Sequence, residues 1–179
     1  MKKIMLLLPI FGMIMIGCED NKAEDTIDES VQEFVSVNIK TTGTEYFTFA
    51  DNKGTTTEPS SWDLSFTVVD FQPSPQAPVI KDPVIIIGNG KTAAKIEAAS
   101  LADFESMPAA TLFKVDKDGY YTTMGWYDYD HTTHVISPKD YIYAIKVDDA
   151  KNILFEIVDY YDANGSSGSF TIQWKYLAN

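Results

Sequence analysis

"YIYAIKVDDAKNILFEIVDYYDANGSSGSFTIQWKY" spans residues 141–176 and contains three apolar runs separated by two polar turns. In the last run, Phe170, Ile172, Trp174 and Tyr176 alternate with polar side chains. This period of two is typical of a strand with one buried face. Strands of this kind, joined by short turns, predict an antiparallel sheet.

The rest of the chain continues the strand pattern. The sequence predicts strands at 30–40, 44–50, 61–71, 84–90, 141–147, 152–161 and 169–176. Residues 51–61 and 72–78 contain turn formers and prolines and are predicted to be loops. Only residues 91–107 lean helical, and they are also compatible with an ordered loop bearing one or two turns. We therefore expect an all-β fold, a single antiparallel β domain over residues 34–179 with little helix.

The N-terminus has the features of an export signal. Two lysines precede a short apolar run that ends at Gly17-Cys18, which predicts a signal peptide over residues 1–17. Met15 to Cys18 resembles a bacterial lipobox, in which the cysteine becomes the lipidated first residue of the mature protein. Cys18 is the only cysteine of the chain, and the alternative is a free thiol left after ordinary cleavage.

An acidic segment follows this cysteine. Residues 19–30 read "EDNKAEDTIDES" and show no apolar periodicity, so residues 18–33 are predicted to be a flexible tether. The segment also resembles the surface-export signal of some outer-membrane lipoproteins, although a plain linker explains it equally well. Loss of Lys2 and Lys3 with the signal takes the formal charge from -12 to -14. Such a chain should repel nucleic acid.

Catalytic motifs are hard to assemble from this sequence. A zinc site needs three or four protein ligands, whereas the chain has two histidines, His131 and His134, and one cysteine. The Gly88-Asn89-Gly90-Lys91 turn lacks the spacing of a phosphate-binding loop. No glycine-flanked serine elbow is evident. We therefore expect a protein that is not an enzyme.

Both histidines follow the aromatic run "GWYDYDH", residues 125–131. Trp126, Tyr127 and Tyr129 could be ordinary core residues. They could equally form a flat platform for a ligand, either a sugar or a porphyrin.

Four stretches together resemble the HmuY family of haem-binding outer-membrane lipoproteins. They are "SSWDLSF" (60–66), "GWYDYDH" (125–131), "YIYAIKVDDAKNILFEIVDYY" (141–161) and "FTIQWKY" (170–176). The resemblance implies an all-β fold that holds haem between two protruding loops. It also implies iron acquisition at the cell surface, with haem passed to a TonB-dependent outer-membrane receptor.

The resemblance implies axial iron ligands as well. One family ligand follows a Gly-Trp-aromatic strand, and His131 occupies that position here. The other comes from the preceding segment, which contains no histidine in this chain but does contain Met107. Two residues are too few to pass around a porphyrin, so His134 is expected to be accessory. If 124–131 were one strand, Met124 would lie on the face opposite His131.

Trp126 and Tyr129 complete the predicted haem site, with His131 and Met107 as ligands of the iron. The alternative function is a lipoprotein of the same fold that binds no haem. It would instead bind a glycan on the Trp-Tyr face, or a protein partner.

Overall fold

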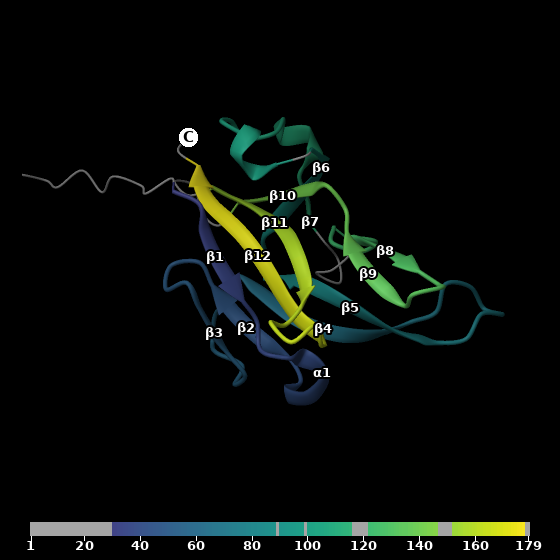
Figure 1. Ribbon diagram of the computed structural model, residues 1–179. Coiled ribbons are helices and arrows are strands. Elements are labelled where there is room, and N and C mark those ends of the chain that lie inside the picture. The colour runs from purple at the N-terminus through teal and green to yellow at the C-terminus, as the bar shows by residue number, and fades with distance from the viewer. Residues whose placement is uncertain (1–29, 89, 99, 116–121, 147–151, 178–179) are drawn as a thin grey trace, which may run out of the picture.

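The computed structural model describes residues 30–88, 90–98, 100–115, 122–146 and 152–177. In this part of the chain, antiparallel strands form two larger sheets and one two-stranded hairpin (Figure 1). The predicted all-β fold is therefore confirmed. The predicted signal at 1–17, Cys18 and most of the tether lie outside the described residues.

The larger sheet is centred on the C-terminal strands. In spatial order its strands are β1 (Gln32–Val35), β12 (Ser167–Leu177), β11 (Asn152–Tyr161), β10 (Tyr141–Lys146), β6 (Thr92–Glu97) and β7 (Lys114–Val115). Each pair of neighbours is antiparallel. The three closing strands predicted from the sequence are adjacent, because short turns join consecutive antiparallel strands.

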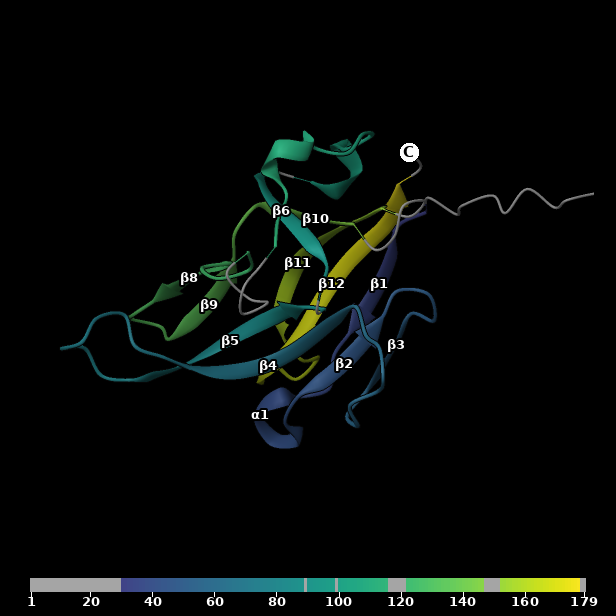
Figure 2. The ribbon, with the colours of Figure 1, turned by 180° about the vertical axis from the view of Figure 1, so that it is seen from behind.

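The smaller sheet has the order β3 (Lys53–Thr55), β2 (Glu45–Thr48), β4 (Leu64–Phe71) and β5 (Ile80–Ile87). Strands β4 and β5 pair along their whole length, from Leu64 opposite Ile87 to Phe71 opposite Ile80. The far end of this long hairpin projects beyond the two sheets (Figure 2). A short helix, α1 (Ile39–Thr42), connects β1 to β2.

The main core lies between these two sheets. Phe66 and Phe47 of the smaller sheet meet Phe170 and Trp174 of the larger one, with ring centroids 5.5 and 6.4 Å apart. All four side chains are buried. Burial of each such ring stabilises the fold by roughly 1.5–3 kcal/mol relative to exposure, so these aromatic contacts hold the sheets together.

A second, smaller core covers the outer face of the six-stranded sheet. Ala94, Ile142 and Leu154 form it with Leu101, and Met107 packs against it from the segment after β6. That segment contains two short 3-10 helices, η1 (Leu101–Asp103) and η2 (Ala110–Leu112). The Lys175 ammonium of β12 donates to the Phe104 carbonyl over 2.6 Å and ties the segment to the sheet.

The helical leaning of residues 91–107 is wrong for its first half, which forms β6. Ala93 faces the main core and Ala94 the outer one, so both faces of the strand are buried. Pairing with β10 overrides the helix propensity of alanine. Three smaller differences are the end of the first strand at Val35, the presence of β3 in a predicted loop, and the start of β5 at Ile80.

Candidate functional site

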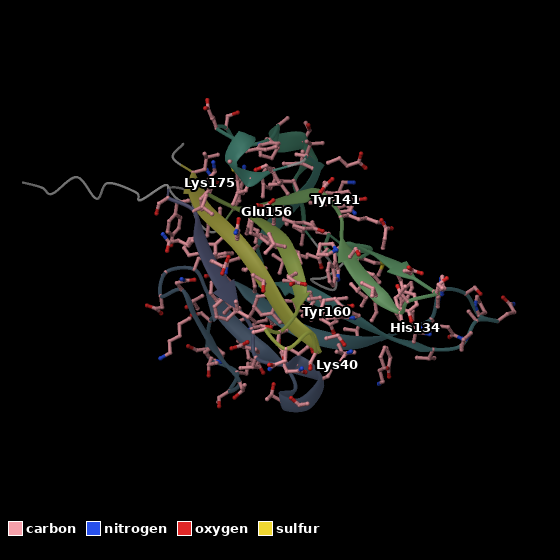
Figure 3. All side chains as sticks on the ribbon, in the orientation of Figure 1. Lys40, His134, Tyr141, Glu156, Tyr160 and Lys175 are labelled. Carbon is pink, nitrogen blue, oxygen red and sulfur yellow. The ribbon has the colours of Figure 1, made fainter. Side chains whose placement is uncertain are left out.

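The two histidines lie on a small hairpin beside the sandwich, formed by β8 (Tyr127–Asp130) and β9 (Val135–Pro138). Figure 3 shows His134 at the end of this hairpin, beside the projecting end of β4 and β5. Residues before β8 fix the hairpin to β5, the edge strand of the smaller sheet. The Thr123 hydroxyl donates to the Ile85 carbonyl over 2.5 Å, and the Trp126 indole donates to the Pro83 carbonyl over 2.8 Å.

Trp126 belongs to the core rather than to a surface platform. Its side chain is 1% exposed, and its ring contacts Phe170 and Tyr160, with centroids 5.1 and 5.7 Å apart. The structure therefore places Trp126 as the anchor of the hairpin. Of the two aromatic residues predicted to contact a ligand, only Tyr129 lies at the surface, 41% exposed.

A partly buried hydrogen bond holds the base of the hairpin. The Tyr127 hydroxyl donates to the Asp82 carboxylate over 2.6 Å. Burial raises the pKa of the Asp82 carboxyl above its ordinary value, while the hydrogen bond from Tyr127 opposes that rise. Burial and the neighbouring carboxylate raise the pKa of the Tyr127 phenol. On the other strand, the Ile136 amide donates to the Tyr161 hydroxyl over 2.8 Å.

The turn between β8 and β9 is organised by Asp130. Its carboxylate accepts hydrogen bonds from the Thr132 and Thr133 amides and from the Thr133 hydroxyl. These bonds lower the pKa of the Asp130 carboxyl. The turn closes with His134 at a φ of 60°, in the left-handed region that costs a side chain energy. The imidazole of His134 is therefore carried by a residue with a strained backbone conformation.

Tyr129 brings the two histidines together. Its hydroxyl lies 2.6 Å from Nδ1 of His134. Its ring meets the His131 ring edge to face, with centroids 5.0 Å apart. Among the hydrogen bonds within the described residues, none involves either nitrogen of the His131 ring. His134 retains Nε2.

A concavity of about 310 Å³ lies next to His131. The end of the long β4–β5 hairpin contributes Phe71 and Ile80 to its wall, and the segment before β8 contributes Met124. Met124 was expected on the face opposite His131 if residues 124–131 formed one strand. This expectation is wrong, because β8 begins only at Tyr127 and Gly125 turns the chain with a φ of 70°. A glycine within a strand pattern signals such a break. Met124 and His131 therefore line the same concavity.

Met107 lies elsewhere. It packs on the outer face of the six-stranded sheet, whereas the hairpin carrying His131 packs through Tyr127 and Ile136 against the core between the sheets. The sheet itself separates the two positions. The structure does not bring Met107 and His131 together.

Two further observations describe the part of the chain that the structure covers. No group of three or more His, Cys, Asp or Glu side chains gathers there in a way that could hold a metal ion. None of its helices has the length and apolar character needed to cross a membrane. A single-iron cofactor with its own macrocyclic ligands requires no such cluster of side chains.

Comparison with known proteins places the fold. No protein-family model matches the chain, and no curated protein matches it. Solved structures do match: a lipoprotein candidate from Bacteroides fragilis NCTC 9343 is 16% identical, with a TM-score of 0.63 over 84% of this chain and 91% of that one. A candidate HmuY-like haem-binding protein from Bacteroides vulgatus ATCC 8482 is 14% identical, with a TM-score of 0.59 over 84% and 94%.

The apo HmuY analogue of Tannerella forsythia also matches, at 11% identity, with a TM-score of 0.56 over 87% of this chain and all of that one. These likenesses cover nearly the full length of both partners. The molecule is thus an all-β sandwich with a projecting hairpin pair. More particularly, it has the fold of the HmuY-like proteins.

Proposed function

We propose that this protein is a haem-binding surface lipoprotein that captures haem at the concavity between the β4–β5 and β8–β9 hairpins, and that it binds rather than catalyses. The observation that supports this most directly is that His131 and Met124 line one concavity. The likeness to a structure described as a haem-binding protein adds support at the level of the fold.

The side chains at this site fit haem iron. An imidazole nitrogen and a thioether sulfur are both established axial donors, and the pair tends to raise the reduction potential. His131 carries an imidazole that no described hydrogen bond engages, and we assign it as the first ligand. Met124 is the candidate for the second position, in place of Met107.

The surroundings combine apolar wall with two carboxylates, those of Asp82 and Asp128. Phe71 and Ile80 supply apolar wall, and Val79 and Val135 near the ends of the two hairpins are 58% and 42% exposed. Neither valine is among the residues that line the concavity. A bound porphyrin would remove the apolar area of Phe71 and Ile80 from water.

Hemin titration of the purified protein, followed in the visible range, tests the proposal. We expect a saturable low-spin spectrum for the wild type, its loss in His131→Ala, and a five-coordinate or water-ligated spectrum in Met124→Ala. Met107→Ala is the matched control, because it removes the same side chain from the opposite face of the sheet. It should titrate like the wild type.

Two outcomes would overturn parts of this assignment. If Met107→Ala changes the spectrum and Met124→Ala does not, the second ligand comes from the outer face, and the chain must rearrange on binding. If His134→Ala abolishes the spectrum while His131→Ala retains it, the accessory role belongs to His131. No hemin-dependent spectrum at all would reject haem capture.

We also propose that Cys18 anchors the mature protein in the outer membrane by its lipid, facing the cell exterior, and that haem passes to a TonB-dependent receptor. The lipobox-like sequence and the lipoprotein match support the anchor. Replacement of Cys18 by Ser should move the protein from the membrane fraction to the soluble fraction. Unchanged membrane association would contradict lipidation.

The second candidate function is recognition of a protein partner by the same two hairpins. The exposed aliphatic residues Val79, Ile80 and Val135 favour it, because such side chains are common at the centres of protein interfaces. A wild-type protein that fails to bind hemin would move this candidate to first place. A glycan platform built on Trp126 receives no support, since that ring is buried.

A further inference from the structure

A second hollow, of about 470 Å³, lies at one end of the sandwich and is separate from the concavity beside His131. It is lined by Ile39 and Lys40 of α1, Val68 of β4, Lys81 and Pro83 of β5, Ile136 of β9 and Tyr160 of β11. None of these residues lines the other concavity. We call this hollow the α1 cleft.

The walls of the α1 cleft are mainly apolar, yet its charges are all positive. Ile39, Val68, Pro83 and Ile136 supply aliphatic surface, and the lining includes two lysines and no carboxylate. The whole chain has 26 acidic residues against 14 lysines and arginines. Asp70 pairs with Lys81, so Lys40 is the cation that makes the cleft complementary to an anion.

The two lysines differ in availability. Lys81 forms an ion pair with Asp70 at the surface. Lys40 takes part in none of the ion pairs within the described residues; its ammonium donates to the Ser167 hydroxyl over 2.6 Å and lies 5.6 Å from the centre of the Tyr160 ring. Figure 3 shows Lys40 and Tyr160 close together at this end of the molecule. The charge of Lys40 is therefore open to an incoming anion.

An irregularity in β11 places Tyr160 at the cleft. Ile153, Phe155 and Ile157 face the main core at odd positions, but the pairing with β12 shifts register between Ile157 and Asp159, and again before Tyr161. After this bulge the even position, Tyr160, faces inward and is fully buried. A bulge that redirects one side chain is a recurrent device next to binding sites.

The hydroxyl of Tyr160 is buried, and within the described residues it has no hydrogen-bond partner. Burial raises the pKa of this phenol to about 12, so at neutral pH it keeps its proton. A buried donor without an acceptor destabilises the fold. Tyr160 lines the cleft, and an acceptor in the cleft could engage its hydroxyl after a rearrangement that exposes this group.

We propose that the α1 cleft binds a small amphipathic carboxylic acid, with its aliphatic body against Ile39, Val68 and Ile136 and its carboxylate near Lys40 and Tyr160. An inorganic anion would leave the aliphatic walls wet, and a neutral lipid would leave the Lys40 charge without a partner. Only a molecule with both parts matches the lining. This site is independent of the haem proposal.

Isothermal titration of the purified protein with octanoate tests this site. We expect saturable binding of octanoate and much weaker binding of 1-octanol, which has the same chain without the charge. Lys40→Gln should weaken octanoate binding about fivefold, because it removes one charge-assisted contact. Lys95→Gln is the matched control, since Lys95 also lies over a tyrosine ring, that of Tyr141, but outside the cleft lining. It should bind like the wild type.

A second pair of variants reports on the hydroxyl. Tyr160→Phe should weaken octanoate binding about threefold without lowering the melting temperature of the free protein, because the hydroxyl has no described partner to lose. Tyr143→Phe removes the other buried hydroxyl without a described partner. It should leave octanoate binding unchanged.

Several results would overturn the proposal. They are the absence of saturable octanoate binding, equal binding of octanol and octanoate, or equal loss in Lys40→Gln and Lys95→Gln. Octanoate binding should also survive in His131→Ala, and its loss there would mean that both ligands share one site. Hemin titration of Lys40→Gln should match the wild type, so failure of haem capture and failure of this site are distinguishable.

Discussion

The six-stranded sheet and the β8–β9 hairpin are both rich in aromatic residues, but they use them in opposite ways. In the sheet, Phe155 and Phe170 are fully buried between the two layers. In the hairpin, three of the four residues of β8 are exposed. The hairpin joins the rest of the molecule chiefly through Trp126, Tyr127 and a hydrogen bond from the Ile136 amide to the Tyr161 hydroxyl.

This difference separates stability from the proposed ligand chemistry. The sheets determine whether the chain folds, whereas the end of the hairpin carries side chains on which the core does not depend. A fold built in this way can change its ligand-binding residues at little cost in stability. Structures only 11–16% identical to this chain share its fold, which agrees with such tolerance.

Truncation of a core ring should give the largest effect on stability. Phe170→Ala removes contacts to Phe66, Trp126 and Tyr160 and should lower the free energy of unfolding by about 3–5 kcal/mol. Tyr129→Ala, at the exposed end of the hairpin, should change it by no more than about 0.5 kcal/mol. Urea unfolding of both variants measures the contrast. Similar losses in the two would remove the distinction between the regions.

The base of the hairpin should show an intermediate effect that depends on pH. Tyr127→Phe leaves the buried Asp82 carboxylate without its donor and should cost about 1–3 kcal/mol at neutral pH. Loss of the hydrogen bond raises the pKa of Asp82 further. A group whose pKa is raised by folding contributes stability at low pH and loses it as the pH rises through the folded pKa.

The deficit of Tyr127→Phe should therefore shrink as the pH falls into the range where the Asp82 carboxyl is protonated. Thermal unfolding at neutral and mildly acidic pH tests this expectation. Tyr143→Phe, which removes a hydroxyl without a described partner, should show no such trend. A Tyr127→Phe deficit that stays constant or grows on acidification would mean that Asp82 does not carry the coupling.

The smallest stability effect is expected at the proposed iron ligand. The ring of His131 makes an edge contact to Tyr129 and no described hydrogen bond, so His131→Ala should change the free energy of unfolding by no more than about 0.5 kcal/mol. The same variant should lose the hemin spectrum. A loss of several kcal/mol in urea unfolding would show that His131 is structural.

The sequence predicts strands well where burial alternates with a period of two. The closing strands are recognisable because Phe170, Ile172 and Trp174 all face one core. The strand β6 is not recognisable, because alanine favours helices locally and pairing with the distant β10 and with β7 makes the segment a strand. Pairing of this kind depends on contacts that no short window of sequence contains.

The candidate site was predictable only in part, because the positions of some of its residues depend on contacts that no short window of sequence contains. The sequence indicates His131 and His134 because they are the only histidines of the chain. It indicates Tyr129 because this aromatic residue lies next to them in the sequence. It does not predict that Met124 shares a concavity with His131, because this depends on the turn at Gly125. It also does not predict that Met107 lies on the outer face of the six-stranded sheet, away from His131. Tyr160 was missed because a bulge changes which side of β11 faces inward.

The two side-chain bonds to β5 bear on how the molecule behaves at high concentration. An edge strand with open carbonyls can pair with another chain and start aggregation. Thr123 and Trp126 occupy two of those carbonyls with side-chain donors, so the anchor of the hairpin also shields the edge of the sheet. A chain that lost Trp126 would be at risk of self-association through β5. Colloidal solubility, rather than ligand affinity, would then limit which residues can occupy position 126.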